Sequence, residues 1–427
     1  MTDPSNAAAM REASPFRLTL EQQRKRAKEL LAALRAGEPA ALQRFHRRHP
    51  RGAAAAPCLA EAQLVIAREL GLPSWPRLVA HIAALEASRA RIRRGAPPPD
   101  GDLPTLHLRC GCDIAPGLRA AGFVGAFLDY ADPLCQGPVL PGADWLEARI
   151  DFLHRSYGAD AGLDRAAIAA RRRREEAALL EAARHPRVVL WFEHDSYDQL
   201  LLARCLAAFA ARPPARLELI SPGHYPGGTR FIGLGQLPPE ALRLLWAERV
   251  PVPAAMLALG EAAWAALRAP DPRPLAALAA GTPDLPQLGR ALRRHCQELP
   301  WTGDGLGLSE RLILQLLAEA PRSAGAVFSA LMLEREPLPW MTDLIGREVI
   351  DGLRRGATPL LAGRFEGAER HWAGAHLDLT PAGRAVLAGE RDRMTLGPPP
   401  RWLGGVPVPG VAPCWRWDEA GGGVILA

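Results

Sequence analysis

Four apolar segments of strand length are each followed by carboxylate, imidazole or hydroxyl side chains. The clearest of them is Val188–Phe192, which stops abruptly at Glu193, His194 and Asp195, where a helical pattern begins. This order is typical of a buried parallel strand that ends at the edge of an α/β sheet. The polar residues that follow the four segments are Asp113, Asp129, Asp132, Glu193, His194, Asp195, Ser221 and His224. Because the carboxyl ends of parallel strands share one edge, we expect these side chains to converge on a ligand-binding site.

Two kinds of chemistry suit these residue types. Carboxylates and imidazoles bind divalent metal ions, which activate water for hydrolysis. A carboxylate–histidine pair can instead transfer protons near neutral pH. A structural interpretation also fits: Ser196 and Gln199 have the spacing of a capping box, and Asp195 favours the start of a helix. The sequence alone assigns no catalytic residue, metal ligand or cofactor.

A glycine-marked segment, Phe231–Gln236, precedes a helix that starts near Pro238. The backbone amides around Gly233 and Gly235 could hold a phosphate group at this helix start. The segment matches neither a Walker loop nor a full dinucleotide fingerprint, so tight packing or a turn is the favoured explanation of the glycines.

The central region alternates strand and helix signals. Its expected strands are Leu106–Cys110, Val124–Tyr130, Val188–Phe192 and Arg216–Ile220, and helical patterns cover about 114–120, 143–156 and 164–184. Alternation of this kind predicts an α/β fold with a mostly parallel open sheet flanked by helices.

Helical patterns dominate both flanks of this region. The first flank contains Leu20–Leu34, Ala40–Arg47, Leu59–Leu70 and Pro73–Leu85, with Ser74 as the N-cap of the fourth helix. The second contains Leu308–Ala318, Ala324–Leu333 and Asp343–Arg355, then two short strands and the helix start Leu379–Arg384, an order typical of a winged helix. Residues 401–406 and 414–418 are expected to form a closing β-ribbon.

These patterns predict five parts of the chain. They are a flexible tail (1–15), a helical module (16–86), a linker (87–104), an α/β domain (105–300) and a winged-helix-like C-terminal domain (301–427).

Charge and cysteine content restrict the class of protein. The net charge of +6 comes almost entirely from arginine, since Lys25 and Lys28 are the only lysines. A compositional bias explains this better than an anionic partner. The helix Asp343–Arg355 mixes both charge signs, so nucleic-acid binding by the C-terminal region is possible but not favoured. The run Arg171–Arg174, followed by two glutamates, is expected to form a solvated helix face.

Seven scattered cysteines favour a reduced, cytoplasmic setting. No apolar run approaches the roughly 20 residues needed to cross a bilayer, so no membrane association is expected. The start of the chain lacks the pattern of a signal peptide.

Several segments together resemble a known family. These are the Asp113 turn, Asp129 with Asp132–Pro138, Leu190–Leu200, Phe231–Leu237 and Arg401–Gly405. They are similar to the bacterial domain-of-unknown-function family 1835, over roughly residues 105–420. The resemblance implies a cytoplasmic α/β domain followed by a helical part, and no defined activity. Relatives commonly have Gly-Asp-Ser at the first turn, whereas this chain has Gly111-Cys112-Asp113. The helical leader around residues 67–78 resembles those on some ankyrin-repeat proteins, although no such repeat is present here.

Three functions remain open from the sequence. The leading hypothesis is an α/β domain that binds a phosphorylated or nucleotide-like small molecule and is coupled to the winged-helix-like part, as in a regulatory protein. The second is a metal-dependent hydrolase that uses the same strand-end residues. The third is a protein-interaction scaffold without catalysis, whose protein partner the sequence does not identify.

Overall fold

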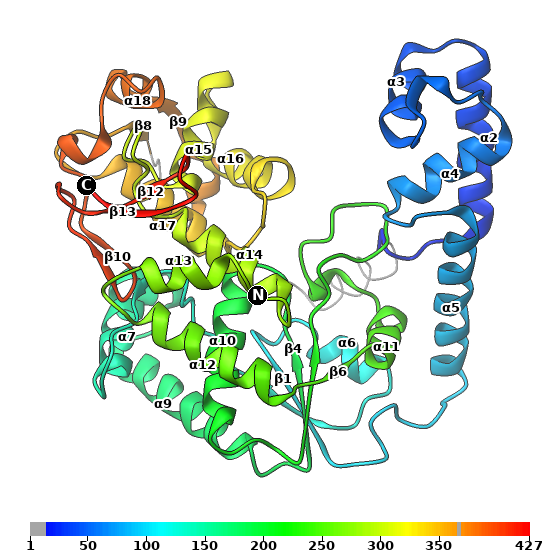
Figure 1. Cartoon of the computed structure of the whole chain (residues 1–427), viewed down its shortest axis with the longest axis horizontal. Coiled ribbons are helices and arrows are strands. Elements are labelled where there is room, and N and C mark those ends of the chain that lie inside the picture. The colour runs from blue at the N-terminus through cyan, green and yellow to red at the C-terminus, as the bar shows by residue number, and fades with distance from the viewer. Residues whose placement is uncertain (1–13, 365–368) are drawn as a thin grey trace. The chain divides into compact units, whose positions relative to one another are not determined.

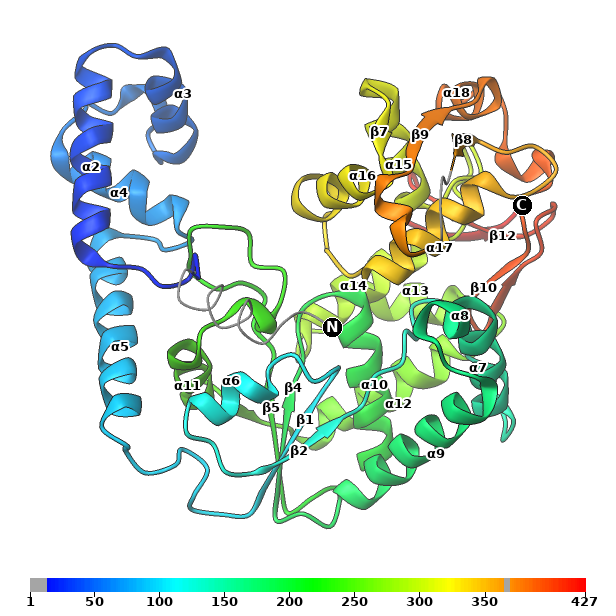
Figure 2. The ribbon, with the colours of Figure 1, turned by 180° about the vertical axis from the view of Figure 1, so that it is seen from behind.

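The computed structural model describes residues 14–364 and 369–427, so most of the predicted tail lies outside the described residues. The fold is α/β, and its central sheet is mostly parallel and flanked by helices, as the sequence predicts (Figures 1 and 2). The strands are β1 (Thr105–Arg109), β2 (Ala126–Asp129), β4 (Arg187–Trp191), β5 (Arg216–Ile220) and β6 (Val250–Pro251). The sequence did not indicate β6, which is only two residues long and shows no alternation.

The strand order is β2-β1-β4-β5-β6. Strands β4 and β5 are parallel and in register from Arg187 opposite Arg216 to Trp191 opposite Ile220. Counted among the sheet strands alone, this order is 2-1-3-4-5, the doubly wound order in which the chain reverses its direction of growth between the first and third strands. The carboxyl ends of β1 and β4 therefore form the topological switch point, where open α/β sheets bind their ligands.

The described residues fall into two compact units. The first contains those of the ranges 1–105, 111–127 and 222–250, and the second contains those of 106–110, 128–221 and 251–427. This division differs from the domain boundaries expected from the sequence, because the helical leader shares a unit with two segments of the central region. The predicted C-terminal domain shares its unit with most of the sheet.

The first unit is built from helices. They are α2 (Leu20–Arg35), α3 (Pro39–Arg48), η1 (Gly52–Ala54), α4 (Leu59–Glu69), α5 (Trp75–Arg93), α6 (Ala115–Ala120), η3 (Leu234–Gln236) and α11 (Pro239–Ala247). Ser74 caps α5 by accepting a hydrogen bond from the Arg77 amide at 3.5 Å, as predicted. The buried Glu240 of α11 pairs with Arg17 at 3.0 Å and with Arg89 of α5 at 2.8 Å. These ion pairs join the leader to α11.

The predicted linker 87–104 is wrong over its first third, because α5 continues to Arg93. Residues 86–93 contain good helix formers and no glycine or proline, so no residue ends the helix there. Ser88 is buried and donates a hydrogen bond to the Glu240 carbonyl at 2.9 Å, which anchors this part of the helix.

Helices of the second unit pack on the sheet and on one another. They are α7 (Trp145–Leu153), η2 (His154–Gly158), α8 (Ala159–Ala161), α9 (Arg165–Ala182), α10 (Ser196–Ala210), α12 (Ala254–Leu267), α13 (Arg273–Ala279) and α14 (Pro286–Cys296). Helix α10 lies against α12 and α14 (Figure 1). Leu190 and Leu219 of the sheet share one buried cluster with Leu201 and Leu206 of α10. This apolar packing fixes the start of α10 against the end of β4.

The C-terminal part of the second unit contains helices and short antiparallel strands. Its elements are α15 (Leu308–Glu319), β7 (Arg322–Ser323), α16 (Ala324–Ala330), η4 (Leu331–Arg335), α17 (Asp343–Arg354), β8 (Leu361–Arg364), η5 (Glu369–Gly374), β9 (His376–Leu379), α18 (Pro381–Leu387) and η6 (Arg393–Leu396). The three strands form a small sheet in the order β7-β9-β8, with both pairs antiparallel.

The expected closing β-ribbon is wrong, because its two halves belong to different sheets. Strand β10 (Arg401–Gly404) pairs with β11 (Val406–Val408) and, in parallel, with β3 (Gly137–Pro138). Strand β12 (Trp415–Asp418) pairs instead with β13 (Gly423–Leu426). A Cβ on Gly404, whose φ is +61°, would lie 2.5 Å from the Leu267 carbonyl oxygen, so this turn requires glycine. Within the described residues, no helix is both long and apolar enough to span a membrane.

Candidate functional site at the sheet edge

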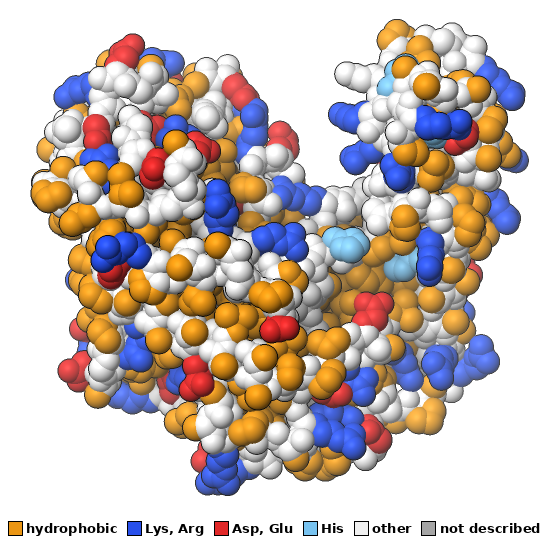
Figure 3. Space-filling view, in the orientation of Figure 1, with side chains coloured by type: hydrophobic (Ala, Val, Ile, Leu, Met, Phe, Trp, Pro, Cys, Tyr) orange, Lys and Arg blue, Asp and Glu red, His pale blue; other side chains and the backbone are white. Residues whose placement is uncertain are grey.

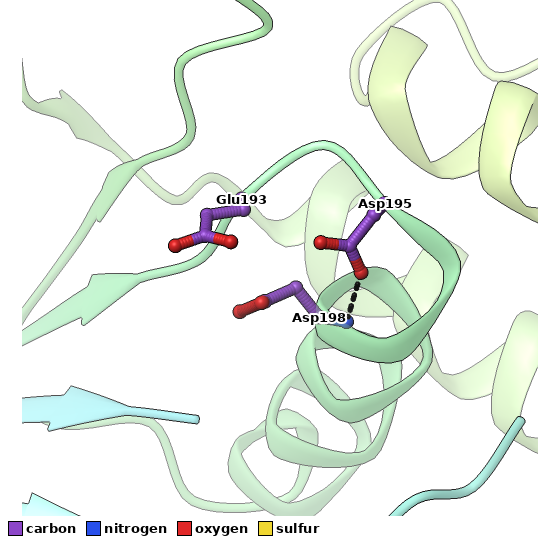
Figure 4. Close-up of side chains that lie close together, drawn as sticks. All are labelled: Glu193, Asp195 and Asp198. Carbon is purple, nitrogen blue, oxygen red and sulfur yellow. Dashed lines mark hydrogen bonds between the residues drawn. The ribbon is translucent and has the colours of Figure 1, made fainter. Parts of the chain in front are cut away.

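Three carboxylates lie together where β4 ends and α10 begins. Glu193 follows β4, Asp195 precedes α10 and Asp198 is in its first turn (Figure 4). Each offers a carboxylate oxygen, and these oxygens lie within 4.8 Å of one another. All three residues are buried, with no more than 6% of their surface exposed. Glu193 and Asp195 are among the site residues predicted from the sequence, whereas Asp198 is not.

Side-chain hydrogen bonds hold this connection in place. Asp195, rather than Ser196, is the N-cap of α10, and its carboxylate accepts a hydrogen bond from the Asp198 amide at 3.0 Å (Figure 4). Ser196 instead donates to the Ala291 carbonyl at 3.2 Å. The Gln199 amide nitrogen donates to the Glu193 carbonyl and, at 3.1 Å, to the Ser221 hydroxyl. The expected capping box is wrong, because Ser196 and Gln199 serve these tertiary contacts.

Arg109, the last residue of β1, neutralises part of this acidic cluster. Its guanidinium forms ion pairs with both Glu193 and Asp198, and all three side chains are buried. The sequence patterns did not indicate Arg109, although an arginine at the end of a strand-length segment was a usable signal. Buried charges of this kind are costly unless they are paired, so the two contacts make the cluster compatible with the core.

Burial changes the proton affinity of the cluster. It raises the pKa of Asp195 well above the usual value, and the negative charge of Asp198 raises it further. Burial likewise raises the pKa of the Cys110 thiol, with Asp198 adding to the effect. A protonated Asp195 beside the Arg109 ion pairs could donate a hydrogen bond, while Glu193 and Asp198 accept them.

Asp132 and Asp129, which the sequence placed in the same site, have structural partners. Asp132 is fully buried, and Arg149 and Arg172 pair with its carboxylate. Burial alone would raise its pKa, but these two arginines outweigh burial and hold the pKa below its usual value. Asp129 is half-buried and lies 3.5 Å from Arg171. The structure thus gives Asp132 a role in an internal ion-pair network.

Four predicted site residues belong to the first unit. Asp113 and His224 are exposed. A Cβ on Gly235 would lie 2.5 Å from an Asp113 carboxylate oxygen, so Gly235 permits close contact with that side chain. The amides of Ile232 and Gly233 donate to the Gln236 side-chain oxygen at 2.7 and 3.2 Å. The Gly233 amide, expected to help hold a phosphate, therefore donates its hydrogen bond within the turn instead.

The remaining predicted residues, His194 and Ser221, lie in the second unit with the cluster. His194 is buried between Glu193 and Asp195 in the chain, and Ser221 follows β5 and is half-buried. No protein-family profile and no curated protein sequence matches this chain. Membership of family 1835 thus stays a prediction from the quoted motifs.

Proposed function

We propose that this chain is a cytoplasmic small-molecule-binding protein whose ligand reaches the carboxyl ends of β1 and β4. The observation that carries the proposal is the group formed by Arg109, Glu193, Asp195 and Asp198 at the topological switch point of the sheet. Ligands of open α/β sheets bind at this position, and polar groups buried there are the groups that select them.

The chemistry of the cluster favours a part of the ligand that carries hydroxyl or amino groups. Glu193 and Asp198 are hydrogen-bond acceptors when ionised, and Arg109 is a donor only. Among these four groups, carboxylates outnumber the guanidinium, so they suit the sugar or base of a nucleotide-like ligand better than its phosphate. A nucleoside-like portion is therefore the proposed occupant of this edge.

We further propose that residues 308–387 form a winged-helix-like module that responds to the ligand. Three helices and three strands occur in the order α15-β7-α16-α17-β8-β9, and the sheet order β7-β9-β8 is the order expected of that module. The third helix, α17, would be the recognition helix. Its Arg347 is paired with Asp160 of α8 and lies near Asp351, so α17 offers little free positive charge to phosphates. A regulatory contact to protein thus fits better than DNA binding.

Surface charge supports the same preference. On the face shown in Figure 3, basic and acidic side chains are interspersed among apolar ones. A duplex-binding protein needs clustered positive charge. A gel shift on random duplex DNA at two salt concentrations tests the point, and tight binding lost on Arg347→Gln would contradict the preference.

A thermal-shift screen of nucleosides and nucleotides tests the binding proposal. A hit whose stabilisation disappears in both Glu193→Ala and His194→Ala, but persists in the exposed control Arg384→Ala, is the expected result. If no compound stabilises the protein while pull-downs recover one stoichiometric partner, the binding proposal is wrong and the scaffold hypothesis takes its place.

Metal-dependent hydrolysis is the second candidate, because one observation favours it. The oxygens of Glu193, Asp195 and Asp198 are close enough to contact a single cation, and hard oxygen ligands suit Mg²⁺ or Mn²⁺. Such an ion would polarise a phosphoester and activate water there. Bound metal in the purified protein, with metal-dependent turnover lost in Asp198→Asn, would support the hydrolase. The absence of turnover on a phosphoester panel with either metal added would reject it.

A further inference from the structure

A second site candidate is a cavity of about 640 Å³ in the second unit. It lies between η2, α17 and β10, and it includes the β3 segment that pairs with β10. A volume of this size accommodates a small organic ligand. The segment η2 is a π-helical turn between α7 and α8, a rare distortion that is frequent at functional sites.

The acidic side chains that line the cavity have cationic partners. Asp160 pairs with Arg347, Glu348 pairs with Arg355, and Glu310 pairs with Arg393. The other two are Asp351, which pairs with Arg354 at 3.0 Å, and Glu298, which pairs with Arg294 at 2.6 Å. Each lining carboxylate thus has a cationic partner, although Arg294 also pairs with Glu336 at 2.7 Å.

Two arginines of the lining contact backbone oxygens instead. Arg155 of η2 donates to the Asp151 carbonyl at 3.2 Å, and Arg401 of β10 donates to the Glu298 carbonyl at 2.6 Å. Among the side chains that the structure describes, neither has a carboxylate within 4.0 Å. Each guanidinium has five N–H donors, so both keep donors for a ligand. Five arginines and five carboxylates line the cavity, so its lining carries no net charge, but Arg155 and Arg401 present donors from two of its walls.

The cavity also offers flat apolar surface beside these cations. Trp402, with 37% of its surface exposed, belongs to the lining together with Phe152. Gly137 has φ of +73°, and a Cβ there would lie 2.5 Å from the Phe152 ring, so this glycine allows the ring to pack on β3. Because Arg149 also lies 4.9 Å from the centroid of the Phe152 ring, Trp402 is the aromatic side chain proposed to stack on a planar ligand ring.

We propose that this cavity binds a phosphorylated small molecule with a planar ring, such as a nucleoside phosphate. Arg155 and Arg401 hold the phosphate by charge-assisted hydrogen bonds, and Trp402 contacts the ring. Because α17 forms one wall, the bound ligand contacts the proposed recognition helix directly. The inference does not depend on the proposed function, because it uses none of the residues at the sheet edge.

Calorimetric titration of the full-length protein with AMP and with inorganic phosphate tests the proposal. We expect AMP to bind more tightly than phosphate, with an affinity that falls as salt is raised. Arg155→Gln and Arg401→Gln should each weaken AMP binding about tenfold, as expected for loss of one charge-assisted contact. Arg155→Lys should lose less affinity for AMP than Arg155→Gln does. Trp402→Ala should weaken the binding of AMP but not that of phosphate.

Two controls keep the result interpretable. Arg384→Gln removes an exposed arginine of α18 that pairs with Asp378 outside the cavity, and its binding should equal that of the wild type. Arg155 is exposed, so its variant tests the proposal even if Arg401→Gln fails to fold. The proposal is overturned if neither probe binds the wild type, or if Arg155→Gln binds AMP unchanged. If Glu193→Gln loses AMP binding while the cavity variants keep it, the cavity proposal is wrong and AMP binds at the sheet edge.

Discussion

The guanidinium of Arg109 forms a buried ion pair with the Glu193 carboxylate, and it thereby joins the end of β1 to the end of β4. These two strand ends form the topological switch point of the sheet. The pair thus connects the fold to the proposed function, and it also makes a clear prediction about stability.

Arg109→Met should destabilise the protein by about 3–5 kcal/mol, because it removes the buried cation with which Glu193 and Asp198 pair. Urea unfolding at pH 7 measures the loss. Glu193→Gln in the same chain should recover part of the lost stability, since it removes one of the two carboxylate charges that faced Arg109. An unchanged unfolding midpoint in Arg109→Met would show that the network contributes nothing to stability.

The raised pKa of Asp195 predicts an unusual pH dependence. Burial and the charge of Asp198 place the folded pKa above the unfolded value of about 3.9, so the folded state binds the proton more tightly. The contribution of Asp195 to stability should therefore fall as pH rises from about 4 through its folded pKa. Asp195→Asn keeps a capping side chain but does not titrate. Its free energy of unfolding should therefore rise relative to that of the wild type over this range. Chemical denaturation of both proteins between pH 4 and 8 tests this prediction. A difference in free energy of unfolding that stays constant with pH would contradict the expected pKa shift.

His295 predicts the opposite dependence. Burial, with the nearby charges of Arg294 and Arg401, lowers the pKa of its imidazole to about 3. The unfolded state then binds more protons below about pH 6.5, so stability is complete above this pH and falls between about pH 6.5 and 3. Over the full range the loss is up to about 5 kcal/mol. In His295→Gln this acid-induced loss should be smaller. Identical slopes for the two proteins would show that His295 is not buried in its neutral form.

Gly137 and Gly142 form a matched pair of glycines for testing the cavity wall. Both have positive φ, but a Cβ on Gly137 would clash with Phe152, whereas a Cβ on Gly142 would meet nothing within 4 Å. Gly142→Ala should cost about 1–2 kcal/mol from backbone strain alone. Gly137→Ala should cost about 1–3 kcal/mol more, because the core is overpacked. Equal losses in chemical denaturation would mean that Phe152 does not pack on β3.

Much of the fold followed from local sequence patterns. The strand Arg216–Ile220 was predicted with its observed bounds, and β4 was predicted within one residue. Strand β4 is an apolar run after Arg187 and is buried throughout, whereas β5 alternates buried Leu217 and Leu219 with the polar Arg216 and Glu218. Helices α2 and α15 were predicted within one residue for the same kind of reason: one face of each is apolar at helical spacing.

Contacts between distant segments could not be predicted in this way. Strand β3 is two residues long and pairs with β10 from the end of the chain, a pairing that no periodicity indicates. Arg172 lies in the run expected to be solvated, yet it is buried, because its guanidinium forms ion pairs with Asp132 and Glu176. Arg109 was missed for a similar reason, since its partners lie more than 80 residues further along the chain. Sequence patterns show which face is buried, but the partners of a buried charge depend on the tertiary fold.

The central claim is that the end of β4 contacts a small-molecule ligand. Its most direct test is calorimetric titration of adenosine, which carries no phosphate, into the wild type, Glu193→Gln and Arg384→Gln. The account predicts saturable binding to the wild type and Arg384→Gln, weakened at least tenfold in Glu193→Gln. Equal affinity in all three proteins, or no binding to any of them, would contradict it.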